Sequence, residues 1–184
     1  MLDQTFVFRA LLSSSPVGLN DLPRSRGIYA LHDHMGTMRY IGITQSSSSN
    51  FYDRIYNRHV TGSESRSHKF SHAYNTGRMW RALKDNGPDA SAAKRLRTAF
   101  VRRYCKASYL EVAAESFGEL PKLELAVQAL AGREMLTWCD KRGFSALPEP
   151  KGLVDALIDD LRFSSSDRAT VERQARRQNS GKLV

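Results

Sequence analysis

Two tyrosines, two arginines and a histidine lie close together in the first third of the chain. Tyr29 and Tyr40 each belong to a short apolar run, and the stretch that follows them carries Arg54, Arg58 and His59. Arginine presents a planar fork of donors that matches phosphate oxygens, while phenol and imidazole groups can orient or deprotonate water. The residue types and their spacing therefore indicate a site that handles phosphate.

The pattern of apolar residues predicts the elements that position these side chains. Residues 27–31 and 38–44 are predicted strands of an antiparallel hairpin. A helix is predicted over residues 51–60, with Asn50 as its N-cap and Phe51, Ile55 and Arg58 on one face. The later predicted elements are a short helix over 77–86, a basic helix over 91–104, a strand over 108–114, and a helix from Leu120 to about Asp140.

The hairpin resembles that of the GIY-YIG nuclease superfamily. The tripeptides GIY at residues 27–29 and YIG at residues 40–42 give the family its name, and Arg54 follows them at the family's place. The resemblance covers roughly residues 22–140. It implies an α/β (α+β) fold in which a small three-stranded antiparallel sheet is flanked by helices. It also implies a metal-dependent DNA endonuclease that cuts phosphodiesters by direct attack of activated water.

The resemblance assigns a role to each residue of the phosphate site. Tyr29 is implied to be the general base or water positioner, with a pKa lowered by nearby cations, and Tyr40 to orient water and phosphate. Arg54 is implied to hold the scissile phosphate. The family's helix histidine follows the arginine by four residues, whereas here Arg58 has that position and His59 comes one residue later. Either the helix contains a local irregularity, or Arg58 takes part of the histidine's role.

A single carboxylate on the helix after the third strand is the metal ligand that the resemblance implies. Glu124 and Glu134 both lie there. Glu134 is preferred because the run REML resembles the family's pattern, and because helical spacing puts it on a stripe with Val127 and Leu130. An acid on an apolar face is costly without a partner, although partial exposure or a salt bridge is the alternative. Mg²⁺ or Mn²⁺ suits one carboxylate together with waters and substrate oxygens.

Further contacts with substrate are predicted outside this core. Gly42, Lys69, Asn75 and Arg78 are the predicted additional substrate-binding residues, together with Arg58. For residues 75–78 a turn before a helix is an equally good interpretation. The basic helix, extended to residue 106, is either a face for the nucleic-acid backbone or a solvated helix with its apolar stripe inward.

Composition favours a nucleic-acid partner. The chain has 184 residues, a net charge of +9 and a pI near 9.8, and such a surplus favours polyanion binding through phosphate contacts. No apolar run has the length of a membrane-spanning helix, and the N-terminus lacks the order of a secretory signal. We therefore expect a cytoplasmic protein with no membrane partner, associated with the nucleoid when bound to DNA. Because each chain has a single predicted site, cutting of both strands would suggest a homodimer or sequential nicking.

The predicted organisation has three parts. These are an N-terminal extension over residues 1–21, a GIY-YIG-like nuclease domain over 22–148, and a C-terminal helix with a basic tail over 149–184. The tail is predicted to be disordered or to fold only on a partner. Many family members carry an asparagine after the glutamate, yet none occurs between Asn86 and Asn179. This departure motivates a second interpretation, a nucleic-acid-binding module without catalysis; a third is a protein-interaction domain that uses residues 152–184.

Overall fold

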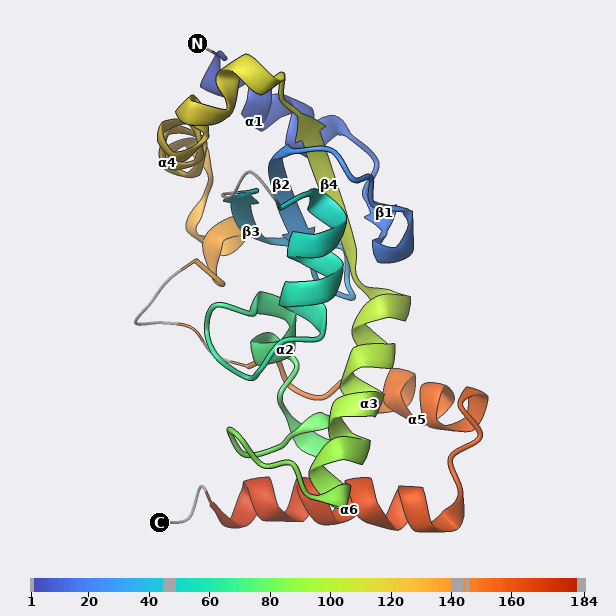
Figure 1. Ribbon diagram of the computed structural model, residues 1–184. Helices are drawn as coiled ribbons and strands as arrows, with labels where there is room; N and C mark the ends of the chain where they lie inside the picture. The colour runs from blue at the N-terminus through green and yellow to red at the C-terminus, as the bar shows by residue number, and fades with distance from the viewer. Residues whose placement is uncertain (1, 45–48, 140–143, 145, 182–184) are drawn as a thin grey trace. The chain divides into compact units, whose positions relative to one another are not determined.

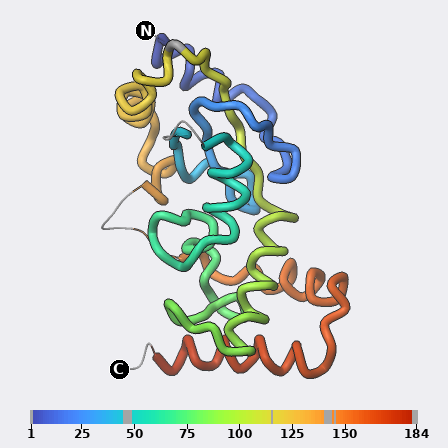
Figure 2. Tube along the Cα trace, viewed as in Figure 1, coloured from blue at the N-terminus to red at the C-terminus, as the bar shows by residue number. Residues whose placement is uncertain are grey.

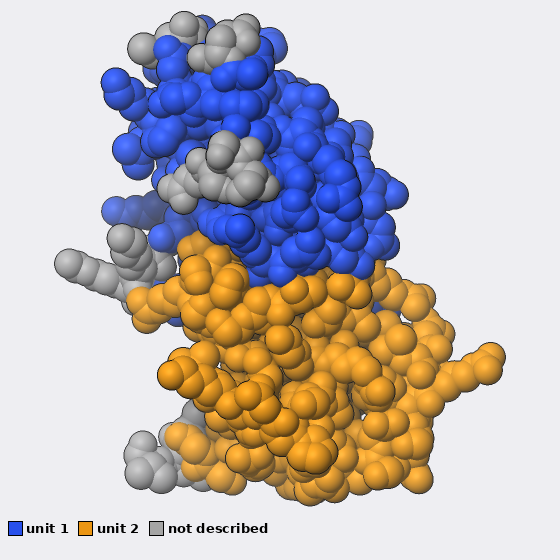
Figure 3. Space-filling view, in the orientation of Figure 1, with its two compact units in different colours: residues 1–58, 104–144 blue, residues 59–103, 145–184 orange. Residues whose placement is uncertain are grey.

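Two compact units make up the protein in the computed structural model (Figure 3). The structure describes residues 2–44, 49–139, 144 and 146–181. Unit 1 contains Met1–Arg58 and Tyr104–Phe144, and unit 2 contains His59–Arg103 and Ser145–Val184. The chain therefore passes from one unit to the other three times, as its trace can be followed (Figure 2). Within the described part of the chain, none of the helices combines the length and apolar character needed to cross a bilayer.

A four-stranded antiparallel sheet forms the centre of unit 1 (Figure 1). Its strands are β1 (Val17–Gly18), β2 (Gly27–His32), β3 (Met38–Ile43) and β4 (Lys106–Glu111), in the order β1-β4-β2-β3. The predicted hairpin of β2 and β3 is confirmed, and β4 is the predicted third strand. The prediction of three strands was wrong by one, because the two-residue β1 pairs with the outer edge of β4.

Helices α1 (Gln4–Ser13) and α4 (Leu120–Leu130) cover one face of this sheet. Successive side chains of a strand point to opposite faces, so Ile28 and Ala30 of β2 and Ile41 and Ile43 of β3 contribute to this core, and Met38 joins them beyond the register shift at Leu31 and His32. The core residues are Val7, Leu11, Ile28, Ala30, Met38, Ile41, Ile43, Val112, Leu120, Leu123 and Val127. The chain before residue 22 is thus part of the core, through Val7 and Leu11. Unit 1 also contains two 3₁₀ turns: η1 (Leu19–Asp21) follows β1, and η4 (Ala114–Glu119) lies between β4 and α4.

A π-helix, η2 (Tyr52–Val60), follows the hairpin and carries the arginines of the phosphate site. Asn50 is its N-cap as predicted, since its Oδ1 accepts from the Asp53 N–H at 2.8 Å. Phe51 and Ile55 are buried, but Arg58 is exposed, so the predicted α-helical stripe was wrong at Arg58. A π-helix closes its hydrogen bonds over five residues, and this wider turn moves the buried face one residue onward.

The predicted helix from Leu120 to about Asp140 was wrong beyond Leu130; Asp140 itself lies outside the described residues. Ala131 and Gly132 have extended backbones with ψ of 141° and 155°, which ends α4. Arg133–Leu136 then forms a separate 3₁₀ turn, η5. After it, the Trp138 N–H donates to the Arg39 carbonyl oxygen at 2.9 Å, beside the β3 edge.

Unit 2 is helical. Its described elements are α2 (Lys69–Ala73), η3 (Gly77–Met79), α3 (Pro88–Tyr104, of which the last residue belongs to unit 1), α5 (Lys151–Asp160) and α6 (Ser165–Ser180). The basic helix is confirmed as α3. The predicted helix over residues 77–86 was wrong except for η3, and Lys84 has a left-handed φ of 66°, which no helix accommodates.

The basic tail, for which composition predicts disorder or folding on a partner, is helical in α6. A capping box between Ser164 and Asp167 starts the helix. Val171 is buried, and the Arg173 guanidinium donates to both carboxylate oxygens of Asp89 at 2.8 Å. Contacts within unit 2 therefore give an order that composition did not indicate.

Candidate functional site

Tyr29 and Tyr40 meet on the sheet face opposite α1 and α4. Tyr40 pairs with Leu31 and Gly42 pairs with Tyr29, so the two tyrosines lie diagonally across β2 and β3. Their ring centroids are 6.0 Å apart, and Tyr40 is 9% exposed whereas Tyr29 is fully buried. Phe51, at the start of η2, packs edge-on against Tyr29 with a centroid distance of 6.3 Å. The hairpin and the following helix thus pack the two phenol rings close to each other.

Steric contacts explain why both tripeptides contain glycine, at positions 27 and 42. A Cβ on Gly42 would stand 2.7 Å from the Tyr40 hydroxyl oxygen and 2.8 Å from its Cζ, so only glycine leaves room for this ring. A Cβ on Gly27 would overlap the carbonyl oxygen of Leu110 in the neighbouring strand. Gly42 is therefore a residue that shapes the site through Tyr40.

Arg54 of η2 joins the two phenols. Its guanidinium is a hydrogen-bond partner of the side chains of both Tyr29 and Tyr40. The guanidinium is the donor because arginine has no acceptor, so the phenol oxygens accept. Burial alone would lower the pKa of Arg54, but the two phenols raise it above its usual value. Arg54 therefore remains a cation, and it is only half-buried.

The pKa of Tyr29 is raised, and the expectation of a lowered value was wrong. Burial raises it to about 12, although the charge of Arg54 and a hydrogen bond from Arg54 act in the opposite direction. Burial is also the largest cause that raises the pKa of Tyr40. Desolvation disfavours the charged phenolate more than one cation favours it. Tyr29 is consequently a neutral phenol near neutral pH.

Glu124 of α4 lies within electrostatic range of both phenols. Besides burial, its negative charge contributes to raising the pKa of Tyr29 and of Tyr40. Gln128, one helical turn later, donates from Nε2 to the Ile41 carbonyl oxygen at 2.9 Å and to Glu124 Oε1 at 3.4 Å. The amide therefore ties the carboxylate of Glu124 to β3. Gln128 did not stand out in the sequence, although a Glu–Gln pair at i, i+4 on a predicted helix was a visible signal.

Glu134 is placed differently. It is exposed on η5, and its carboxylate folds back over Gly132, where Cδ would lie 2.7 Å from a Cβ. The stripe that favoured it over Glu124 does not exist, because α4 ends at Leu130.

The oxygen donors of unit 1 fit a hard divalent cation. Mg²⁺ commonly uses one or two carboxylates, keeps several waters and takes substrate oxygens as its other ligands. Glu124 supplies one such carboxylate, within electrostatic range of the two phenols. No group of three or more His, Cys, Asp or Glu that could hold a metal occurs in the described parts of the chain. The arrangement thus suits a metal that is held partly by substrate, rather than a closed protein cage.

Arg58 and His59 stand on either side of the division between the units. Arg58, the last residue of unit 1, is exposed. His59, in unit 2, is fully buried, and its Nδ1 accepts from the Lys69 backbone N–H at 3.1 Å. The proton of the neutral ring is therefore on Nε2. His59 follows Arg54 by five residues, one more than in the family, and a local irregularity of the helix was one explanation. The π-helix is such an irregularity, because its hydrogen bonds close over five residues.

The other predicted substrate contacts belong to unit 2. Asn75 accepts at Oδ1 from the Arg81 N–H at 2.9 Å and from Arg97 Nη1 at 2.6 Å. Arg78 donates to Glu149 and to Asp155, each at 2.6 Å. Lys69 is half-buried at the start of α2. Asn75 and Arg78 thus have protein partners, which favours the interpretation of residues 75–78 as a structural turn.

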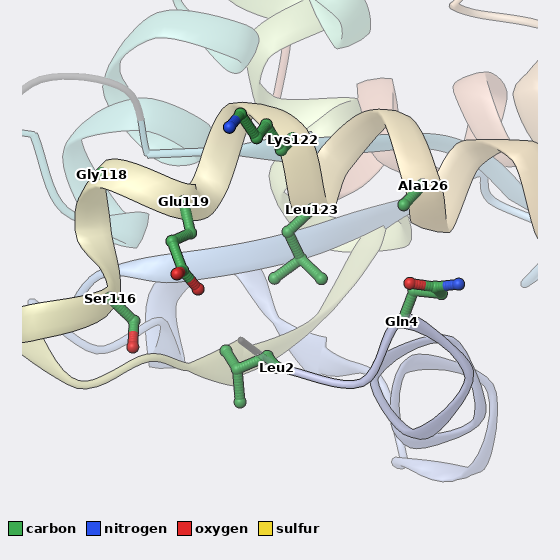
Figure 4. A pocket seen from close by; sticks show the side chains of 8 residues that line it. All are labelled: Leu2, Gln4, Ser116, Gly118, Glu119, Lys122, Leu123 and Ala126. Carbon is green, nitrogen blue, oxygen red and sulfur yellow. The ribbon is translucent and has the colours of Figure 1, made fainter.

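A small cavity lies elsewhere in unit 1, between the start of α1 and α4 (Figure 4). Its volume is about 210 Å³, and Leu2 and Leu123 face it from opposite sides. None of its described lining residues belongs to the group of Tyr29, Tyr40, Arg54 and Glu124. Its volume is below the roughly 300 Å³ at which ligand pockets begin, so we assign it no role.

Comparisons with known proteins add no assignment. No protein-family model matches the chain, and no curated protein or solved structure matches it either.

Proposed function

We propose that the protein is a metal-dependent DNA endonuclease of the GIY-YIG type, which hydrolyses phosphodiester bonds with a tyrosine-activated water. One observation carries the proposal. Arg54 is a hydrogen-bond partner of both Tyr29 and Tyr40, and the charge of Glu124, on α4 of the same unit, acts on both phenols. The packing of a hydrophobic core does not need two phenols, a guanidinium and a carboxylate together, whereas phosphodiester hydrolysis can use each of them, to activate water, to stabilise the phosphate and to hold a metal.

Each side chain has a task in this proposal. Arg54 holds the scissile phosphate through its donor fork and neutralises charge that develops on it. Tyr40 orients the attacking water, and Tyr29 accepts the water's proton in its phenolate form and so becomes the neutral phenol. The hydrogen bonds from Arg54 and Tyr40 both lower the pKa of Tyr29 and so favour the phenolate, although burial outweighs them in the protein alone.

Glu124 is the proposed metal ligand, in place of Glu134. A bound Mg²⁺ or Mn²⁺ would supply a Lewis acid that polarises the phosphate and stabilises the leaving oxygen. Gln128 is a positioning residue, because it fixes the carboxylate through its bond to the Ile41 carbonyl. The amide of Gln128 lies one helical turn after Glu124. The chain has no asparagine between Asn86 and Asn179, the region where many family members carry one.

Cleavage of supercoiled plasmid tests the proposal. We expect nicking or linearisation with Mg²⁺ that EDTA abolishes, and that is absent in Arg54→Ala. Arg9→Ala is the control, since Arg9 is an exposed arginine of α1 that has no role in the proposed site. Retained cutting by Arg54→Ala would defeat the assignment.

The second candidate is a nucleic-acid-binding module that does not cut. Two observations favour it: the Tyr29 pKa of about 12 and the full burial of His59. Tight, salt-sensitive DNA binding with no cutting across Mg²⁺, Mn²⁺ and several DNA forms would support this candidate over the nuclease.

A further inference from the structure

A basic groove follows one face of α3 in unit 2. Its volume is about 550 Å³. Its cations are Arg81, Lys94, Arg95 and Arg102, and Asn86 and Ser91 are among its neutral donors. No carboxylate occurs among the described residues that line this α3 groove. A concave surface with one sign of charge concentrates anions.

The helical spacing of α3 arranges the polar side chains in a row. Ser91, Arg95, Thr98 and Arg102 follow one another at intervals of three or four residues, and Lys94 lies three residues after Ser91 and four before Thr98, which keeps them on one face. From Ser91 to Arg102 the row spans about 16 Å of helix axis. The row is therefore suited to an extended ligand with repeated negative groups.

The residues behind the groove add to its positive potential. Arg81 Nε donates to Glu64 Oε1 at 2.5 Å, and buried Arg97 donates to the same oxygen. Two guanidinium groups thus share one carboxylate, which leaves one positive charge in excess. Burial and the charges of Arg81 and Arg97 lower the pKa of Lys94. An anion in the groove would relieve this repulsion.

Unit 2 has a second open basic hollow, which is lined by Trp80, by Asp89 and by residues of α6. Its Arg173 pairs with Asp89 at 2.8 Å and its Arg177 with Asp85 at 3.3 Å. Two cations of this hollow thus form ion pairs with carboxylates of unit 2. In the α3 groove, Arg81 pairs with Glu64 and Arg95 pairs with Asp167 at 3.1 Å, but neither carboxylate is among the described residues that line the groove. The second hollow has a carboxylate, Asp89, in its own lining, so the α3 groove is the stronger anion site.

We propose that the α3 groove binds the phosphodiester backbone of DNA, independently of base sequence. Guanidinium, ammonium and hydroxyl groups are the donors that contact phosphate oxygens. The lining contains no aromatic ring on which a base could stack, and Ala99 is its one apolar residue among those described. This inference rests on the proposed function only in the choice of DNA as the polyanion.

Binding of a short fluorescent DNA duplex, followed by anisotropy in EDTA over a series of salt concentrations, tests the inference. The groove variant is Lys94→Gln/Arg102→Gln. Its matched control is Arg9→Gln/Lys151→Gln, which loses the same charge at exposed positions outside the groove. Each lost phosphate contact should weaken binding on the order of tenfold at about 0.1 M salt and reduce the slope of log K against log salt by about 0.9.

Equal affinity of the groove and control variants would overturn the inference. So would displacement of the duplex by polyglutamate at equal charge concentration, which would identify an acidic peptide as the ligand class. A charge-keeping variant, Lys94→Arg/Arg102→Lys, should restore the salt slope and so separates lost charge from lost folding. Failure of the proposed nuclease has a different signature, since DNA would then bind through the groove without being cut under any metal condition.

Discussion

The ring of Tyr40 occupies the space that a side chain on Gly42 would fill. The two residues are two apart in β3, so both face the same side of the sheet. A Cβ at position 42 would stand 2.7 Å from the Tyr40 hydroxyl oxygen. In the second tripeptide, glycine is thus required at position 42 so that the phenol of Tyr40 can lie beside Arg54.

Gly42→Ala should therefore move the Tyr40 ring and impair cleavage more than stability. A displacement of about 1 Å at a reacting group can reduce a rate about 100-fold. We expect a loss of this order in the single-turnover rate, with a native circular dichroism spectrum. Gly152→Ala in α5 is the control, because a Cβ there meets nothing within 4 Å. Comparable activity of Gly42→Ala and Gly152→Ala would contradict the role assigned to Gly42.

The pH dependence of cleavage should reflect Tyr29. Because burial raises its pKa to about 12, the ionised fraction increases about tenfold per pH unit throughout the ordinary assay range. If Tyr29 accepts the proton from water, the single-turnover rate should rise with a slope near one on a logarithmic scale. Tyr29→Phe should lack both the activity and the slope. A rate that stays level from about pH 7 to about pH 9 would exclude the phenolate as base.

The hairpin could be predicted because local rules specify it. Alternating apolar residues and the two tripeptides set β2, β3 and the place of both tyrosines. The π-helical register of η2 could not be predicted, since the hydrogen-bond step of a helix has no signature in composition. It decides that His59 is buried and Arg58 exposed. The strand β1 escaped for another reason: two residues are too few to show a period.

The choice between Glu124 and Glu134 depended on one helix boundary. Periodicity carried the predicted helix past Leu130, whereas the extended backbones of Ala131 and Gly132 end it there. Gly132 was a visible stop signal, because glycine is common just after helix ends. The proximity of Glu124 to both phenols depends on how α4 packs on the sheet, and that long-range relation is not encoded in any short motif.

Glu64 should govern the acid stability of unit 2. Burial opposes its ionisation, but hydrogen bonds and charges from Arg81 and Arg97 lower the pKa of this carboxyl below its usual value. A lowered folded-state pKa contributes stability above the unfolded-state pKa, and that stability is lost as pH falls through the folded-state value. The melting temperature of the wild type should therefore decrease below about pH 4.

Glu64→Gln should flatten that loss, and near neutral pH it should be destabilised by about 3–5 kcal/mol because buried Arg97 loses its carboxylate. Asp155→Asn is the control. It removes an ion pair with Arg78 in which Asp155 is 60% exposed, and such pairs contribute about 0–1 kcal/mol. Thermal melts across acid pH distinguish the two variants, and identical profiles would refute the assignment to Glu64.

Gln128→Met should weaken the response to metal. The substitution keeps the length of the side chain and removes the amide that holds Glu124, and loss of such a supporting partner typically costs 10–100-fold in metal affinity or activity. We expect the Mg²⁺ concentration for half-maximal cleavage to rise by about tenfold, with a smaller change in the rate at saturating Mg²⁺. Gln4→Met, on the exposed face of α1, should leave both unchanged.

Cleavage by Glu124→Gln and Glu134→Gln, measured side by side over a range of Mg²⁺ and Mn²⁺ concentrations, tests the account most directly. Both variants remove one negative charge and nearly conserve volume. Loss of metal-dependent cutting in Glu124→Gln with activity kept in Glu134→Gln is the predicted result. The reverse pattern, or full activity in both, would contradict a site built from Tyr29, Tyr40, Arg54 and Glu124.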